Sequence, residues 1–153
     1  ESALFNQGFA MAEYLAASFL DMDYHTLTEP LTQDVLVFEE KAMDDIGLIE
    51  EIIPRYRSTY FRHIFASGYS AGYYSYIWAE VLDADAYEAF KEKGIFDKET
   101  ARAFRENILA RGGTQDAMML YKQFRGDEPD IDALLERKGL VERSDVKGDD
   151  NVL

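Results

Sequence analysis

The chain has 153 residues, of which 47% are apolar and 14% aromatic, so it is long enough for one domain with a hydrophobic core and too apolar to be intrinsically disordered. Sixteen Lys and Arg residues against thirty Asp and Glu residues give a net charge of −14, which argues against nucleic acid and anionic membrane surfaces as partners. The absence of cysteine excludes a disulfide framework, a thiolate nucleophile and cysteine ligands for zinc.

The sequence predicts neither a membrane span nor a secretory leader. No stretch reaches ~18 uninterrupted apolar residues, and even the apolar segment 10–20 contains Glu13. No basic region precedes an apolar one near the N-terminus, and we expect a soluble protein. The expected location is the cytoplasm. The chain opens on Glu1, without an initiator methionine, in a segment that already has a structured pattern, which indicates a fragment or a processed piece.

Apolar residues in the first half recur at spacings of three and four, the period of an α-helix. The first helix is predicted over residues 4–22, and the segment 27–32, which contains Pro30, should interrupt the helical pattern. A second helix should begin near Asp34 and stop at Gly47. The expected inward face of the first helix is Phe5, Phe9, Ala12, Ala16, Phe19 and Leu20.

The second half continues with the same period. Helices are predicted over residues 71–82, 84–93 and 98–110, then between Thr114 and Gly126 and between Pro129 and Gly139. The expected N-caps are Asp97 and Thr114, and the expected ends are Gly94 and Gly126. No run of strict two-residue alternation predicts a strand, so the fold class is all-α. We expect a single helical domain over residues 1–153, with a flexible tail from about 142 to 153.

The sequence contains no complete catalytic motif of a known kind. A helical zinc site needs two histidines four residues apart with a glutamate between them, but His25 and His63 are the only histidines and lie far apart in the sequence. There is no phosphate-binding GxxxxGK[ST] loop and no GxSxG nucleophile motif. We therefore predict no metal ligands within this chain.

Residues 63–78 stand out, because they combine a histidine with two glycines and a series of tyrosines. If one helix includes them, three phenols fall within an arc of ~60°. These are Tyr69, Tyr73 and Tyr76. A second stripe, which would anchor the helix to the core, consists of Tyr74, Ile77, Trp78 and Val81. Gly68 and Gly72 carry no side chain, so another backbone or a ligand could approach closely there.

These residues also allow a purely structural interpretation. Tyrosines at helical spacing are often core residues whose hydroxyls reach the surface, and a lone histidine is often a structural hydrogen-bonding group. Composition and spacing alone leave both interpretations open for Tyr69, Tyr73, Tyr76 and His63.

The segment resembles the thimet-oligopeptidase-like zinc metallopeptidases, which include oligopeptidase A and the peptidyl-dipeptidases, also called dipeptidyl carboxypeptidases. The central match is GYSAGYYSY at residues 68–76. Further matches, in the same order along the chain, are FNQGF at 5–9, EYLAA at 13–17, LDMDYH at 20–25, ILARGG at 108–113, FRG at 124–126 and PDIDALL at 129–135. The resemblance covers residues 4–140.

The resemblance implies that the chain is the C-terminal part of a longer, almost wholly helical enzyme whose two halves enclose a channel. It also implies a zinc cofactor held by an HExxH helix and a further glutamate, all outside this chain. The implied partners are short peptide substrates and the remaining, HExxH-bearing part of the same enzyme. We therefore expect this chain to be inactive by itself.

The resemblance further implies roles for His63, Tyr69, Tyr73 and Tyr76. A phenol with a pKa near ~10 stays protonated at neutral pH and can donate a hydrogen bond to the oxyanion of a tetrahedral intermediate. Tyr76 is the first candidate for this donor and Tyr69 the second. His63 would add a donor or bind the substrate backbone, Tyr73 would position the peptide, and Gly68 would let it approach.

The implied activity is hydrolysis of short peptides. Residues 70–74 resemble the bacterial peptidyl-dipeptidases, which release C-terminal dipeptides, more than other branches. The alternatives are an oligo-endopeptidase of the same family and a non-catalytic helical module that binds a peptide or a partner.

Overall fold

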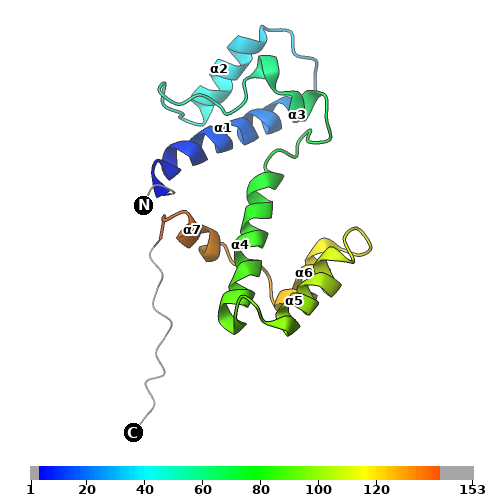
Figure 1. Ribbon diagram of the computed structural model, residues 1–153. Coiled ribbons are helices and arrows are strands. Elements are labelled where there is room, and N and C mark those ends of the chain that lie inside the picture. Colours follow the sequence, from blue (N-terminus) through cyan, green and yellow to red (C-terminus); the bar gives the residue numbers. More distant parts are fainter. Residues whose placement is uncertain (1–3, 142–153) are drawn as a thin grey trace. The chain divides into compact units, whose positions relative to one another are not determined.

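The computed structural model describes residues 4–141, and every regular element in this part of the chain is helical (Figure 1). The predicted all-α fold class is therefore confirmed, while the predicted tail at 142–153 lies outside the described residues. The elements are α1 (Gln7–His25), α2 (Val35–Asp45), the 3₁₀-helix η2 (Ser58–Tyr60), α3 (Arg62–Phe65), α4 (Ser75–Lys93), α5 (Lys98–Phe104), the π-helix η3 (Arg105–Leu109), α6 (Ala117–Arg125) and α7 (Asp132–Arg137).

The chain divides into two compact units, Glu1–Trp78 and Ala79–Leu153, which we call unit 1 and unit 2. Helix α4 begins in unit 1 and continues in unit 2, so the division falls within a continuous helix. A single domain over residues 1–153 stays a prediction.

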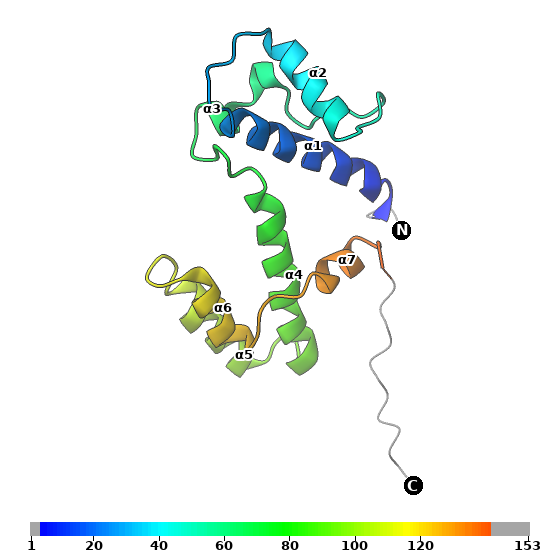
Figure 2. The same cartoon turned by 180° about the vertical axis from the view of Figure 1, so that it is seen from behind.

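In unit 1, α1 and α2 lie side by side in both views (Figures 1 and 2). The buried core consists of Ala16, Ala17, Leu20, Ala42, Met43, Phe61, Ile64 and Tyr73. A buried carboxylate, Glu39 of α2, accepts hydrogen bonds from Arg57 Nε at 2.5 Å and from the Ser58 backbone N–H at 2.6 Å. Because a buried charge needs such partners, these bonds attach Arg57 and the start of η2 to α2.

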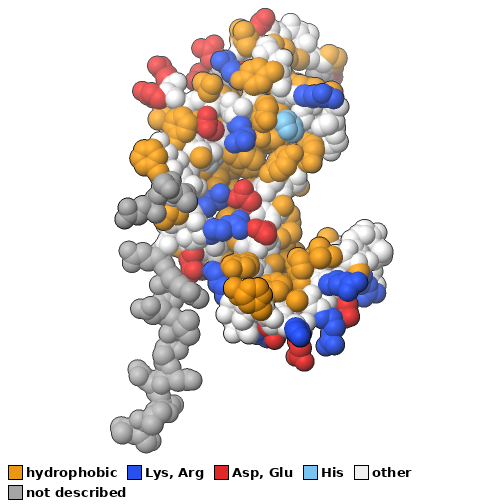
Figure 3. Space-filling view, viewed as in Figure 1, with side chains coloured by type: hydrophobic (Ala, Val, Ile, Leu, Met, Phe, Trp, Pro, Cys, Tyr) orange, Lys and Arg blue, Asp and Glu red, His pale blue; other side chains and the backbone are white. Residues whose placement is uncertain are grey.

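Helix α1 packs through a narrower face than its apolar pattern predicts. Its buried residues are Ala16, Ala17, Ser18, Leu20 and Asp21. Phe5, Phe9 and Phe19 were expected to face inward but are 76%, 43% and 50% exposed. Small residues allow α1 to approach its neighbours closely, and these three phenylalanines lie outside this contact. Hydrophobic side chains accordingly gather on the face of unit 1 seen in Figure 3.

Unit 2 has its own core. Its buried hydrophobic residues are Val81, Ala84, Ala86, Ala89, Leu120, Tyr121 and Leu134. Next to them Phe104 packs on Phe90 and Phe124, with ring centroids 6.0 and 5.2 Å apart. The buried carboxylate of Asp85 accepts a hydrogen bond from Tyr121 Oη at 2.5 Å. The aromatic contacts join α4, α5 and α6 into one layer.

Helix ends follow the predicted caps with two exceptions. Asp34 and Asp97 cap α2 and α5 through their carboxylates, and Gly94 and Gly126 have the positive φ angles that end α4 and α6. The cap of α6 is Asp116 rather than Thr114, because the Thr114 hydroxyl donates to the Arg111 carbonyl instead.

The second exception is α4, which is one helix over Ser75–Lys93 and replaces the two helices predicted over 71–82 and 84–93. It begins four residues later than predicted, because Ala71 adopts a left-handed φ of 52° that a right-handed helix cannot contain. No helix in the described part of the chain is long and apolar enough to cross a membrane.

Candidate functional site

The predicted site residues lie on three consecutive structures in unit 1. His63 belongs to the short helix α3, Tyr69 and Tyr73 lie in the turn 66–74, and Tyr76 is in the first turn of α4. The shared arc of the three phenols required one helix that includes them all, and the structure does not contain such a helix. We call residues 66–74 the tyrosine turn.

The tyrosine turn nevertheless brings the predicted residues together. The rings of Tyr69 and Tyr76 stack with centroids 5.1 Å apart and an interplanar angle of 21°, and Tyr73 meets Tyr76 edge to face at 5.3 Å. The His63 ring lies 6.2, 5.6 and 6.4 Å from the rings of Tyr69, Tyr73 and Tyr76. These four side chains form one aromatic cluster, which we call the His-Tyr cluster.

Members of the His-Tyr cluster differ in exposure. Tyr69 and Tyr76 are 37% and 39% exposed, so their rings are supported on one side and open on the other. Tyr73 is only 3% exposed and belongs to the core of unit 1. Burial raises the pKa of Tyr73 from 10.0 to about 12, so this phenol stays protonated under all ordinary conditions. Two of the three phenols are thus accessible to a ligand.

The exposed phenols influence each other. A hydrogen bond with Tyr69 is the main cause that raises the pKa of Tyr76 above 10.0, and partial desolvation adds to it. A raised pKa keeps the Tyr76 hydroxyl protonated at neutral pH, where it can donate a hydrogen bond.

His63 is half-buried, and its Nδ1 atom is buried without a hydrogen-bond partner among the described residues. A neutral imidazole carries its proton on one nitrogen, and an N–H is more costly to leave unpaired than a lone pair. This arrangement favours the tautomer with the proton on Nε2. His63 can then donate a hydrogen bond through Nε2.

Tyr56 was missed by the sequence analysis, although its ring lies 4.5 Å from the ring of His63 and stacks on Phe61 at 5.3 Å. It belongs to the irregular segment before η2, where no periodic pattern assigns a side chain to a face. The contact between Tyr56 and His63 therefore becomes visible only in the folded chain.

Two residues of α1 were also missed, and both bind the backbone of the tyrosine turn. Tyr14 Oη donates to the Tyr73 carbonyl at 2.7 Å. The carboxylate of Asp21 accepts from the backbone N–H groups of Ala71 and Tyr73, both at 2.9 Å. The sequence contains one sign of this role for Asp21. Asp21 lies one turn after Ala17 on the same face of α1, and a carboxylate on a buried helix face needs specific hydrogen-bond partners.

The glycines of the turn play different parts. A Cβ at Gly68 would meet nothing within 4 Å, so the space beside this residue is open. A Cβ at Gly72 would lie 3.4 Å from the Tyr69 carbonyl oxygen, so a side chain at this position would touch the backbone of the turn itself. Open space at Gly68 is compatible with the predicted close approach of a ligand.

The prediction that the second stripe anchors the helix to the core is wrong for Tyr74 and Trp78. Val81 is buried and Ile77 half-buried, but Tyr74 and Trp78 are 52% and 45% exposed. For Tyr74 the late start of α4 explains the difference, because this residue belongs to the tyrosine turn and its ring does not follow the helical phase.

The sequence profile described as peptidase family M3 matches residues 1–140. The chain belongs to peptidase family M3. Dipeptidyl carboxypeptidase of Salmonella typhimurium (strain LT2) is 45% identical over 142 residues, which are 92% of this chain and 21% of that protein. Oligopeptidase A of Escherichia coli (strain K12) is 59% identical over 80 residues, which are 52% of this chain and 12% of that protein.

Probable cytosolic oligopeptidase A of Arabidopsis thaliana is 37% identical over 149 residues, again 92% of this chain and 21% of that protein. The chain spans about a fifth of the length of the first two curated dipeptidyl carboxypeptidases that it matches. The family resemblance stated from the motifs is thus confirmed, and the His-Tyr cluster lies within the part of the chain that the M3 profile covers.

The residues that the structure describes in this M3 chain do not fit a zinc site of their own. Within residues 4–141 no three His, Asp or Glu side chains gather in a way that could hold a metal ion. His25 Nδ1 lies 2.8 Å from Asp21 Oδ1, and the Nδ1 atom of His63 is buried. The chemistry that the His-Tyr cluster offers is hydrogen-bond donation by phenols and imidazole.

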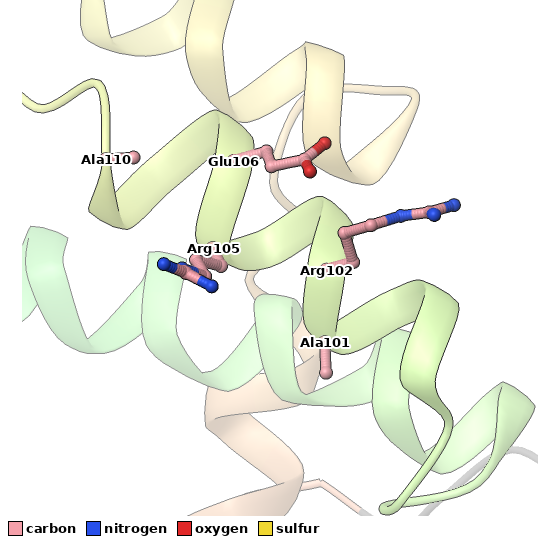
Figure 4. Close-up of a pocket in the computed structure, with 5 residues that line it drawn as sticks. All are labelled: Ala101, Arg102, Arg105, Glu106 and Ala110. Atoms are coloured by element: carbon pink, nitrogen blue, oxygen red, sulfur yellow. The ribbon is translucent and has the colours of Figure 1, made fainter.

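Unit 2 has a surface pocket of about 550 Å³ lined by α5 and η3 (Figure 4). In this view Arg102 and Glu106 extend to one side, while Arg105 extends to the other. The charged groups do not converge on one point, and Glu106 would repel an anion that the arginines attract. The pocket therefore lacks the arrangement of a ligand site, in contrast to the His-Tyr cluster.

Proposed function

We propose that this chain is the C-terminal, substrate-binding part of an M3 peptidase that hydrolyses short peptides. The observation that carries the proposal is the pair of half-exposed, stacked phenols of Tyr69 and Tyr76 beside His63. Their spacing is fixed by a turn that is hydrogen-bonded to α1. Preorganised donors of this kind stabilise an oxyanion without reorganising during the reaction.

In this proposal, Tyr76 donates to the oxyanion that forms at the scissile carbonyl, and Tyr69 supports or shares this donation. His63 donates through Nε2 to the peptide backbone or to the same oxygen. Open space beside Gly68 admits the peptide backbone. Tyr73, whose ring is buried, positions the peptide through the Tyr76 ring that it contacts.

Zinc, held by residues outside this chain, would supply Lewis-acid polarisation of the carbonyl. Every other contribution in the proposal comes from the side chains described above. The net charge of −14 supports a peptide rather than a nucleic acid or a membrane surface as the partner. The name of the Arabidopsis relative, probable cytosolic oligopeptidase A, supports a cytosolic location.

The names of the relatives support two activities within the family. Salmonella dipeptidyl carboxypeptidase matches 92% of this chain, which favours release of C-terminal dipeptides. Escherichia coli oligopeptidase A has the higher identity over a shorter stretch, which favours internal cleavage. We place the peptidyl-dipeptidase activity first because, at the same 92% coverage of this chain, the Salmonella dipeptidyl carboxypeptidase is 45% identical and the Arabidopsis oligopeptidase A 37%.

The test uses the full-length protein that contains this chain, loaded with zinc, and a synthetic peptide with either a free or an amidated C-terminus. Mass spectrometry of the products separates the alternatives. Stepwise loss of dipeptides from the free C-terminus, suppressed by amidation, supports the peptidyl-dipeptidase. Internal cleavage of both peptides supports the oligopeptidase. Binding without cleavage would show that the chain belongs to a non-catalytic module.

A further inference from the structure

Asp21 is a fully buried carboxylate on α1, with an exposed fraction of 0%. A buried charge is unfavourable unless its oxygens are fully hydrogen-bonded, and replacing such a group by apolar residues often stabilises a protein. Its presence in the core of unit 1 therefore calls for a reason other than stability. The hydrogen bonds of Asp21 supply one.

Both oxygens of Asp21 bind the tyrosine turn. Oδ1 accepts from the Ala71 backbone N–H and Oδ2 from the Tyr73 backbone N–H, and His25 Nδ1 lies 2.8 Å from Oδ1. Ala71 has a φ of 52°, a left-handed conformation that is unfavourable for a residue with a Cβ. Two backbone N–H groups separated by one residue converge on the carboxylate, which compensates for this conformation.

Tyr14 completes the attachment from the same face of α1, two helical turns before Asp21. Its hydroxyl donates to the Tyr73 carbonyl and accepts from the Ile77 N–H at 3.1 Å, in the first turns of α4. The backbone of Tyr73 is thus held through its N–H by Asp21 and through its carbonyl by Tyr14. Residues on either side of Tyr73 carry the two exposed phenols.

We infer that Asp21 is a positioning residue for the Tyr69 and Tyr76 hydroxyls: by binding the N–H groups of Ala71 and Tyr73, it sets the path of the turn that spaces the two phenols. This inference rests on the proposed function. Asp21 touches neither phenol hydroxyl, so its effect on the reaction passes through the backbone. Misplacing a donor by ~1 Å can lower the rate about 10²-fold.

The test compares Asp21→Asn with Glu39→Gln in the full-length protein. The amide introduced by Asp21→Asn keeps the size of the carboxylate, but its NH₂ group faces one backbone N–H from which it cannot accept a hydrogen bond. Glu39 is the matched control, because it is also a buried carboxylate of unit 1 that accepts a backbone N–H, and its partners Arg57 and Ser58 lie outside the tyrosine turn.

At a temperature where circular dichroism shows both variants folded, we expect Asp21→Asn to lower kcat by about 10²-fold with little change in KM. Glu39→Gln should lower Tm but leave kcat within about twofold. Asp21→Gly with added formate provides a rescue, since formate can offer two oxygens to the same N–H groups. We expect formate to restore part of kcat in Asp21→Gly and none in Tyr76→Phe.

Hydrogen exchange gives a readout independent of activity. Amides of the tyrosine turn should exchange faster in Asp21→Asn than in the wild type or in Glu39→Gln. Unchanged exchange, or a kcat that falls equally in both variants, would overturn the inference. A wild-type protein that binds zinc but cleaves no peptide would overturn the proposed function, and with it the effect of Asp21 on the reaction, even if the exchange data show that Asp21 holds the turn.

Discussion

Replacing Tyr76 by phenylalanine tests the proposed oxyanion donor with the smallest possible change. The variant loses one hydroxyl that is accessible at the surface, while the ring can keep its stacked contact with Tyr69 and its edge contact with Tyr73. We therefore expect folding to survive. The pKa of Tyr76 is raised above 10.0, mainly by the hydrogen bond with Tyr69, so the hydroxyl is a donor across the neutral range.

Removing one preorganised oxyanion donor typically lowers kcat by ~10²–10³-fold. For Tyr76→Phe we expect the lower end, about 10²-fold, because the Tyr69 hydroxyl lies beside the lost group and can donate in its place. KM should change little, since the bond matters mainly in the transition state. The measurement is steady-state hydrolysis of a quenched fluorescent peptide by the full-length, zinc-loaded protein, with circular dichroism to confirm folding.

Tyr74→Phe is the matched control, because it removes the same hydroxyl from a nearby residue. Tyr74 is 52% exposed, and in the described part of the chain its ring makes no contact with the rings of the His-Tyr cluster. We expect a loss in kcat of less than about tenfold. If Tyr76→Phe keeps near-wild-type kcat while Tyr74→Phe loses most of it, the two roles have been exchanged. Equal, small effects would show that the oxyanion is stabilised without these phenols.

Three further predictions concern the chain itself. The isolated 153-residue chain should neither bind zinc tightly nor hydrolyse peptides, as calorimetric titration and a fluorescent peptide assay can show. Burial raises the pKa of Tyr73 to about 12 and also raises the pKa of Tyr121, so these phenols lose their protons at a lower pH in the unfolded state than in the folded state. The free energy of unfolding should therefore fall as the pH rises from ~10 to ~12. In denaturant titrations, Tyr73→Phe or Tyr121→Phe should make this fall smaller. Asp34→Ala removes the cap of α2 and should lower the free energy of unfolding by about 1 kcal/mol, whereas the exposed Glu40→Ala should change it by less than about 0.5 kcal/mol.

Local signals in the sequence predicted the helices well. Asp97 and Gly94 marked the ends of neighbouring helices correctly, because a capping carboxylate and a glycine with positive φ act on residues close to them in the chain. Thr114 was a reasonable cap by residue type, yet Asp116 binds the Met119 N–H and begins α6. Both residues fit the capping pattern, and only the folded loop decides between them.

The direction in which an apolar stripe packs could not be predicted from periodicity. Phe9 and Phe19 continue the helical pattern of α1 as well as Leu20 does, but Leu20 is buried and the two phenylalanines are about half exposed. Periodicity identifies residues that share a face, whereas their burial depends on which elements reach that face. These elements come from distant parts of the sequence.

The start of α4 depended on contacts of the same distant kind. Residues around Ala71 have no proline or other local signal that excludes a helix, so the pattern extended the helix back to Ala71. The structure departs from that pattern because Asp21, fifty residues earlier in the sequence, binds the N–H groups of Ala71 and Tyr73. A helix beginning at Ala71 would direct these N–H groups differently, and the buried carboxylate would lose its partners.

The same contacts account for the unequal roles of the three tyrosines. Asp21 and Tyr14 hold the backbone of Tyr73 against α1, which places the Tyr73 ring in the core and raises the pKa of its hydroxyl to about 12 through burial. Tyr69 and Tyr76, on either side of this fixed residue, stack on each other and remain accessible. A turn anchored at Tyr73 can therefore present the phenols of Tyr69 and Tyr76 at a defined spacing. A helix with all three phenols on one face would not achieve this without exposing Tyr73 as well.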